Sequence, residues 1–230
     1  ADAKNQARSY PTREPQKSIA FQMMKVKVES LYETNPIVSL QKYKKLVEKN
    51  SSNIAARYGL SLALVKNSSF EEAVNEFEAL RPRLPNTILM LAAYAEVLAS
   101  AGQHQKAEKI VEKRLAISPD NQPLSMIHAK TLIATKRFKE AEKILIRLSK
   151  VRPNDVDIWY ELAETSGLAG NISGVHIARA EYFVLHGAYT RSIQHLEYAK
   201  SLTRGNNPQL QAKLAQQIQD LKTQVRLAKG

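Results

Sequence analysis

A repeat of 34 residues is the feature that most constrains how this 230-residue chain can fold. Ala73, Ala107 and Ala141 recur at that interval. An aromatic or histidine residue stands three positions before each alanine in the sequence, and a proline stands twelve positions after it. These flanking positions are Phe70, His104 and Phe138, and Pro85, Pro119 and Pro153. Three series with one period indicate a chain built from copies of one structural unit.

A period of 34 with a small mid-repeat residue and a terminal proline is typical of the tetratricopeptide repeat (TPR), a pair of antiparallel helices. We therefore expect an all-α fold, a right-handed solenoid of about four to five helix pairs with C-terminal capping helices. The solenoid is predicted over residues 16–204, between the end of an upstream domain with its linker (1–15) and a capping helix (207–230). The expected repeats lie near 20–53, 54–87, 88–121, 122–155 and 156–188, with an extra helix at 189–203.

The first predicted helix, from about Gln16 to Tyr32, has an apolar stripe that we expect to face the core. Its members, Phe21, Met24, Val28 and Leu31, follow helical spacing. The most apolar stretch, Ile88 to Ala101, is too short to span a bilayer and contains Glu96. No transmembrane segment is therefore expected.

The sequence lacks the residue patterns that enzymes of the common classes require. It has no cysteine, which excludes disulfides, thiol catalysis and cysteine-type zinc sites. It also has no Gly-rich phosphate loop, no nucleophile elbow and no His-Glu-x-x-His motif. His104 and His128 fall at packing positions, and His176 and His186 would point about 80° apart on one helix, a poor zinc geometry. We expect no catalytic residue, no metal ligand and no cofactor within this chain.

The formal net charge of +12 leaves a second hypothesis open. A basic protein can bind nucleic acid, a membrane surface or an acidic protein. Glutamates are interleaved with the basic residues at spacings that allow pairing along a helix, which favours a solvated outer face. The alternative function is binding of anionic partners, nucleic acid or acidic protein, by the convex outer face that the second helices of the repeats form. The basic residues concerned are Lys106, Lys109, Lys113 and Arg114, and Arg137, Lys139, Lys143, Arg147 and Lys150.

In a TPR solenoid the first helix of each pair lines a concave groove, where partner segments usually bind. Apolar and aromatic side chains with a few charges at the groove positions suit an extended or helical peptide. The alternative is that the register is off by one and that these residues pack between helices. We name as predicted groove residues Tyr58, Leu62, Leu89, Glu96, Met126, Lys130, Tyr160 and Glu164.

One stretch resembles a known family. Residues 152–187 read RPNDVDIWYELAETSGLAGNISGVHIARAEYFVLHG. This segment resembles the C-terminal TPR region of BepA-like bacterial zinc metalloproteases, which are periplasmic proteases and chaperones of outer-membrane protein assembly. The opening Ala1-Asp2-Ala3-Lys4, followed by Tyr10-Pro11, is similar to the end of their protease domain and the linker after it. The resemblance covers most of the chain and is specific from about 150 to 203.

The resemblance implies a protein–protein interaction module of a periplasmic metalloprotease. It would bind partner or substrate segments in its groove during outer-membrane protein assembly and quality control. The implied partners are the outer-membrane β-barrel assembly machinery, unfolded outer-membrane proteins and the module's own protease domain, with no nucleic acid. The family's zinc motif is absent here, so no zinc ligand carries over. We expect a non-enzymatic piece of a longer metalloprotease, with the zinc in the missing domain.

Overall fold

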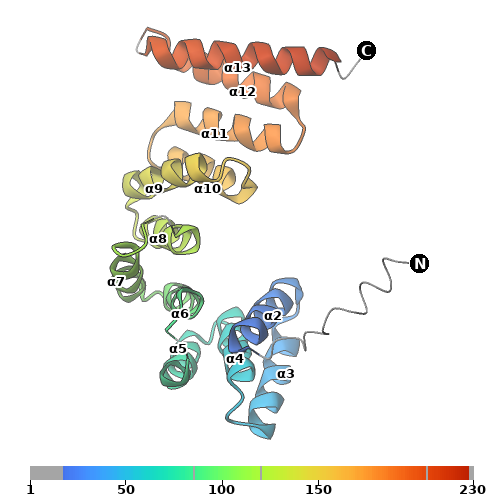
Figure 1. Cartoon of the computed structure of the whole chain (residues 1–230), viewed down its shortest axis with the longest axis vertical. Helices are drawn as coiled ribbons and strands as arrows, with labels where there is room; N and C mark the ends of the chain where they lie inside the picture. Colours follow the sequence, from blue (N-terminus) through green and yellow to red (C-terminus); the bar gives the residue numbers. More distant parts are fainter. Residues whose placement is uncertain (1–17, 85, 120, 206, 228–230) are drawn as a thin grey trace, which may run out of the picture. The chain divides into compact units, whose positions relative to one another are not determined.

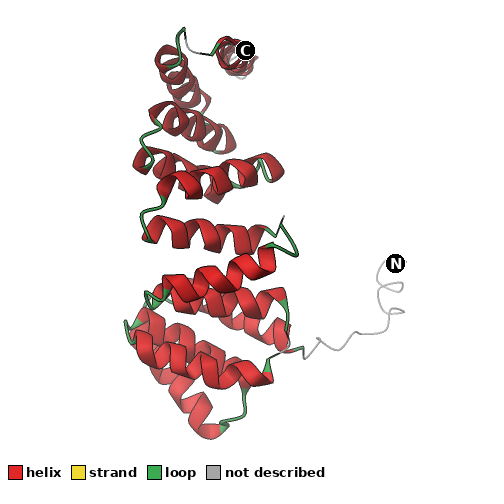
Figure 2. Ribbon diagram, turned by 90° about the vertical axis from the view of Figure 1, so that its left-hand side faces the viewer, coloured by secondary structure: helices red, strands yellow, loops and turns green. Residues whose placement is uncertain are grey.

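The computed structural model describes residues 18–84, 86–119, 121–205 and 207–227, and its regular structure there is helical throughout (Figures 1 and 2). This confirms the all-α class; the predicted linker at 1–15 lies outside the described residues. None of the described helices has the length and hydropathy needed to cross a bilayer. The helices are α2 (Ile19–Tyr32), α3 (Pro36–Lys49), α4 (Ile54–Lys66), α5 (Phe70–Leu80), α6 (Ile88–Ser100), α7 (His104–Leu115), α8 (Gln122–Ala134), α9 (Phe138–Val151), α10 (Val156–Leu168), α11 (Ile172–Leu185), α12 (Tyr189–Leu202) and α13 (Pro208–Leu227), with a 3₁₀ turn at Arg81–Arg83.

The turns between paired helices follow the 34-residue register. Ser68, Gly102, Lys136 and Gly170 occupy equivalent positions, and all four have a positive φ, between 59° and 79°. Glycine adopts this left-handed conformation without steric cost, whereas serine and lysine do not. Local residues also fix where several helices begin. The N-cap side chains of α3, α4 and α8 accept hydrogen bonds from backbone N–H groups of the first turn; these residues are Asn35, Asn53 and Asn121.

The chain divides into two compact units, one up to Ile110 (unit 1) and one from Val111 (unit 2), so that the division falls within α7. In unit 1, α4 packs against α3, α5 and also α2 (Figure 1). The core of this unit contains an aromatic group. The Phe77 ring meets Tyr58 edge-on, with centroids 6.0 Å apart, and stacks on Tyr94 at 5.2 Å. Met23 and Val26 of α2 belong to the same buried cluster.

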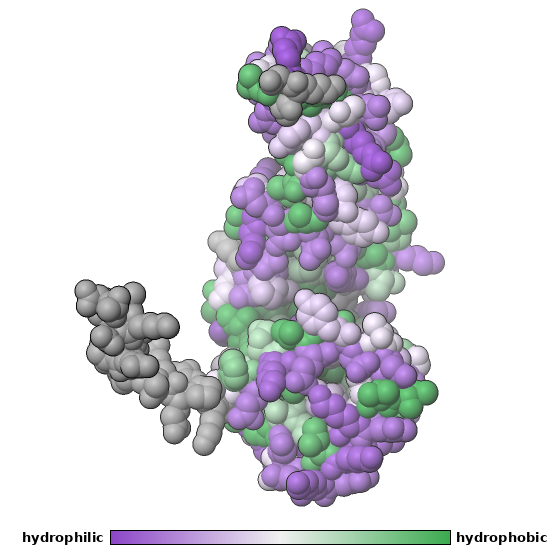
Figure 3. Space-filling view, turned by 90° about the vertical axis from the view of Figure 1, so that its right-hand side faces the viewer, coloured by the Kyte–Doolittle hydropathy of each residue, from purple (hydrophilic) through white to green (hydrophobic). Residues whose placement is uncertain are grey.

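The face of α2 that meets the core differs from the prediction. Phe21, Met24, Val28 and Leu31 are all between 44% and 71% exposed. The buried line is Ile19, Met23 and Val26, of which Met23 is 1% exposed. The helix carries two apolar lines, and periodicity alone cannot say which of them packs on α4. Figure 3 views the side on which Figure 1 draws α2, and it shows hydrophobic side chains at the surface of unit 1 among hydrophilic ones.

In unit 2 each helix from α8 to α13 packs against the next one in the chain, which is the nearest-neighbour contact pattern of a solenoid. Ala141, Ala178 and Ala199 are fully buried, because two helices can approach closely only where a side chain is small. Glu142 ties α9 to the following pair: its Oε1 accepts from Ser166 Oγ and from Asn171 Nδ2, both at 2.7 Å.

Candidate functional site

In unit 1 the predicted groove residues are covered in part by α2. Tyr58 is 2% exposed, and burial raises the pKa of its phenol, with the nearby Glu96 carboxylate adding to the shift. Glu96 itself is bound by Lys27 of α2, whose Nζ lies 2.7 Å from the carboxylate. Leu62 and Leu89 are half-buried against the core. Tyr58 is therefore shielded from solvent, because α2 packs on the helix that carries it, and contact of Tyr58 with a ligand stays a prediction.

In unit 2 the predicted groove residues stay accessible. Lys130, Tyr160 and Glu164 have more than half of their side-chain or residue surface exposed, whereas Met126 is half-buried against the core. Lys130 Nζ lies 3.1 Å from the carboxylate of Glu161, an ion pair that joins α8 to α10. Lys130 is thus paired with α10, the helix that carries Tyr160 and Glu164. Contact with a ligand at these positions stays a prediction.

Tyr160 and Glu164 border a cavity of about 200 Å³ formed by α10, α11 and α12. The Tyr160 and Tyr182 rings lie 6.1 Å apart, so they give the cavity an aromatic wall. Glu164 Oε1 accepts a hydrogen bond from Arg179 Nη2 at 3.4 Å, and about half of each side chain is exposed to solvent. We call this site the aromatic pocket; its lining is Tyr160, Ala163, Glu164, Arg179, Tyr182, Phe183 and His195.

One lining residue of the pocket, His195, belongs to a pair of histidines that the sequence did not predict. The Nδ1 atoms of His176 on α11 and His195 on α12 are 2.9 Å apart, so one ring donates to the other. Phe183 stacks on His195 with centroids 5.4 Å apart. Burial lowers the pKa of both imidazoles, with smaller contributions from the Arg179 cation and, for His195, from His176. A neutral pair suits the hydrogen bond, because one nitrogen must act as the acceptor.

This histidine pair was missed because periodicity along one helix cannot show it. His176 and His195 are 19 residues apart on different helices, and only the packing of α11 on α12 brings them together. The two nitrogens fall short of the four ligands of a structural zinc site or the three of a catalytic one. The pair therefore supports the shape of the aromatic pocket and does not suggest a metal centre.

Comparison with known proteins agrees with the fold and its repeats. Tetratricopeptide-repeat family models match residues 58–122 and 98–164. A tetratricopeptide repeat protein from Parabacteroides merdae has a similar structure, with a TM-score of 0.53 at 15% identity over 94% of this chain and 89% of that one. The protein MamA from Desulfovibrio magneticus gives a TM-score of 0.51 at 13% identity over 74% and 95%. The chain therefore has the helix-pair fold of a TPR solenoid.

The matches to curated relatives concern a narrower group of proteins. The chain is 27% identical to the beta-barrel assembly-enhancing protease of Yersinia pestis over 150 residues, which is 64% of this chain and 30% of the relative. It is 24% identical to the putative beta-barrel assembly-enhancing protease of Vibrio cholerae over 204 residues, 87% of this chain and 42% of that protein. These matches confirm the resemblance to the TPR region of BepA-like proteases. The chain spans less than half the length of either relative.

Proposed function

We propose that unit 2 binds an extended or helical segment of a partner protein across α8, α10 and α11, with one side chain of that segment in the aromatic pocket. TPR solenoids are protein-interaction modules, and this chain contains their repeats. The observation that carries the proposal is the pocket itself, in which two predicted groove residues, Tyr160 and Glu164, lie beside Tyr182 and Arg179.

The chemistry of the pocket fits recognition of a polypeptide. Tyrosine and arginine are the residues most often found at the energetic centres of protein interfaces, because each combines a large contact area with polar groups. The Glu164–Arg179 pair can also reorganise to meet a charged or backbone group of the ligand. Lys130 and Glu161 extend the polar border along α8 and α10.

We further propose that the module serves a periplasmic zinc metalloprotease in outer-membrane protein assembly. The names of the two curated relatives support this role. The partners would then be the outer-membrane β-barrel assembly machinery, unfolded outer-membrane proteins and the module's own protease domain. The zinc and the catalytic residues would belong to that protease domain, and this chain would contribute recognition and no catalysis.

The test is a pull-down from periplasmic extract with the 230-residue chain as bait, at low and high salt. We expect outer-membrane assembly proteins to be recovered at both salts, and Tyr160→Ala to reduce recovery by about tenfold, the effect of losing a good interface anchor. Tyr32→Ala is the matched control, because Tyr32 is 82% exposed on a different helix. Equal recovery with Tyr160→Ala would contradict binding through the aromatic pocket.

The two salt conditions separate this proposal from binding through the basic surface. Attraction between exposed charges is screened by salt, and binding to nucleic acid weakens steeply as salt rises. Loss of every partner at high salt would favour the basic second helices of the repeats over the aromatic pocket. The chain would still have the TPR fold, but its binding site would lie on the basic second helices and not in the aromatic pocket.

A further inference from the structure

A hollow in unit 2 is lined by the residue whose counterpart in the next repeat is a tryptophan. Positions 57, 91, 125 and 159 are equivalent in the 34-residue register and hold Arg57, Leu91, Ser125 and Trp159. The Trp159 indole N–H donates to the carbonyl oxygen of Pro153 at 2.6 Å. One repeat earlier, the counterparts of these two residues are Ser125 and Pro119. Serine has the smallest of the four side chains, and Ser125 is one of the residues that line the hollow.

The space is large enough for a ligand side chain. Its volume is about 440 Å³, within the range of roughly 300–1,000 Å³ that is typical of ligand pockets. Leucine, isoleucine, alanine and proline side chains give it an apolar interior. It is formed by the end of α7, the segment after it, α8 and α9, and we call it the Ser125 hollow; its lining is Glu112, Leu115, Ala116, Pro119, Ser125, His128, Lys143, Ile144 and Arg147.

The hydroxyl of Ser125 has no partner among the described residues. The side chain is fully buried, and its Oγ makes no hydrogen bond there. Another buried serine, Ser61, donates to the carbonyl oxygen of Ala73 at 2.9 Å. A buried polar atom without a hydrogen-bond partner destabilises the folded state. A ligand group that can form a hydrogen bond with Ser125 Oγ would therefore gain affinity.

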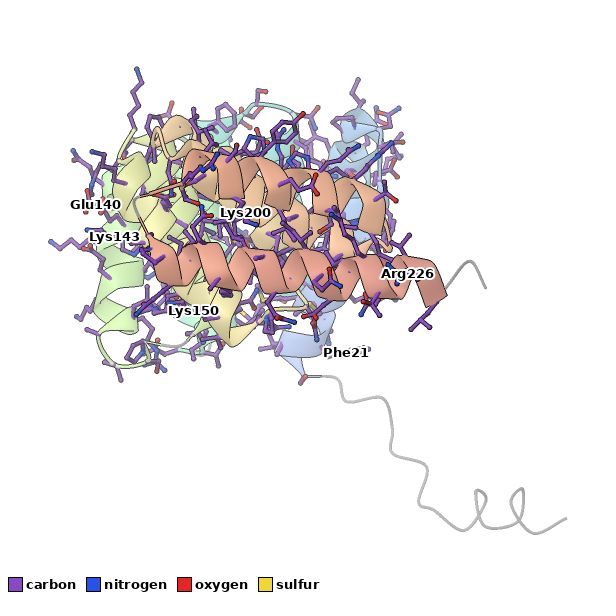
Figure 4. All side chains as sticks on the ribbon, turned by 90° about the horizontal axis from the view of Figure 1, so that it is seen from above. Phe21, Glu140, Lys143, Lys150, Lys200 and Arg226 are labelled. Carbon is purple, nitrogen blue, oxygen red and sulfur yellow. The ribbon has the colours of Figure 1, made fainter. Side chains whose placement is uncertain are left out.

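The border of the hollow is basic on its α9 side. Lys143 and Arg147 lie one turn apart on α9 and are both exposed. Arg147 Nη2 donates to the carbonyl oxygen of Pro119 at 2.9 Å. Within the described part of the chain, no carboxylate forms a salt bridge with either cation, whereas Glu112 on the opposite side lies 3.6 Å from His128 Nε2. Figure 4 labels Lys143 together with Lys150, a second lysine of the same helix.

We propose that the Ser125 hollow binds a tryptophan side chain from an acidic segment of a partner protein. The indole occupies the space that Trp159 occupies in the next repeat, and its N–H donates to Ser125 Oγ. Carboxylates beside the tryptophan pair with Lys143 and Arg147. This site is separate from the aromatic pocket, with which it shares no lining residue.

The test measures fluorescence anisotropy of a labelled acidic peptide, Asp-Glu-Trp-Glu-Asp, with the whole chain. The same peptide with alanine in place of tryptophan is the matched control ligand. We expect the tryptophan peptide to bind at least about tenfold more tightly, because burial of an indole contributes more than the 1.4 kcal/mol that tenfold represents. Equal affinity of the two peptides, or no binding of the tryptophan peptide up to about 1 mM, overturns the proposal.

Three protein variants locate the binding, one of them as the control. Ser125→Trp fills the hollow from within and is expected to abolish binding of the tryptophan peptide; a folded Ser125→Trp protein that binds as before overturns the proposal. Lys143→Glu is expected to weaken binding at least about threefold, whereas Lys150→Glu, the same charge change on the same helix outside the lining, leaves it unchanged. Equal effects of these two lysine variants also overturn it. Because this lysine pair leaves the hollow intact, it decides the question if Ser125→Trp fails to fold.

Discussion

At the scale of single residues, Gly59 in unit 1 lies in a tightly packed contact between two helices. A Cβ at this position would overlap the ring of Tyr43 on α3. That ring cannot easily move away, because Tyr43 is 4% exposed and its hydroxyl donates to Glu29 at 3.2 Å. Burial, together with this carboxylate, raises the pKa of Tyr43 to about 12. Glycine is needed here for the contact between two helices and not for an unusual backbone conformation.

We therefore expect Gly59→Ala to lower the free energy of unfolding by about 1–2 kcal/mol. Overpacking costs about 1–3 kcal/mol, and the better helix propensity of alanine returns up to about 1 kcal/mol. The control is Gly167→Ala on α10, where the nearest side-chain atom to a new Cβ, Val175 Cγ2, is 3.6 Å away. That variant should be neutral or slightly stabilising. Urea unfolding of both proteins measures the difference, and equal midpoints would contradict the packing at Gly59.

The histidine pair gives unit 2 a dependence on pH. Burial lowers the pKa of His176 and His195 in the folded state below the value of about 6.5 in the unfolded chain. The unfolded state then binds more protons as the pH falls through 6.5, so the stability that this pair contributes is present above pH 6.5 and is lost below it. We expect the melting temperature to fall between pH 7.5 and 5.5, and to fall less in His195→Phe. An identical pH dependence in the variant would show that the pair does not titrate in this range.

At the scale of helices, the first and last described helices, α2 and α13, cover their neighbouring helices in different ways. α2 covers α4 with the line that contains Met23 and Val26, and it leaves a second apolar line exposed. α13 instead buries Leu214, Ile218 and Leu221 against α12 and turns a polar surface outward. A terminal helix with a polar outer face is what an open solenoid requires, because its last repeat has no further neighbour.

We expect Leu214→Ala to lower the free energy of unfolding by about 2–5 kcal/mol, since Leu214 is 1% exposed and truncation leaves a cavity. Leu227→Ala is the matched control on the same helix, where the side chain is 77% exposed, and it should change stability by less than about 0.5 kcal/mol. Chemical unfolding followed by circular dichroism compares the two. A similar small effect of both substitutions would mean that α13 does not cap the solenoid.

Sequence patterns could predict the helices but not all of their faces. The period of 34 residues located the helices because capping residues, prolines and turn residues act locally. It also named Tyr160 and Glu164 as groove residues, and the structure places both beside a cavity. It could not show that α2 covers Tyr58, that His176 meets His195, or that Ser125 leaves a hollow, because each of these depends on a helix from elsewhere in the chain.

At the scale of the whole molecule, the two units differ in what they offer a partner. In unit 1 the groove positions are buried, half-buried or paired with α2, as Tyr58 and Glu96 show. In unit 2 Lys130 on α8 and Tyr160 and Glu164 on α10 are accessible, and the two α10 residues border the aromatic pocket. The binding function proposed for this chain is therefore assigned to unit 2.

The most direct test is photo-crosslinking from a light-activated phenylalanine analogue placed at position 160 or, as the control, at position 32. Both native residues are exposed tyrosines, 55% and 82% respectively, so neither replacement disturbs the core. In periplasmic extract we predict crosslinks to outer-membrane assembly proteins from position 160 and none from position 32. Crosslinks of equal strength from both positions, or from position 32 alone, would contradict recognition through the aromatic pocket.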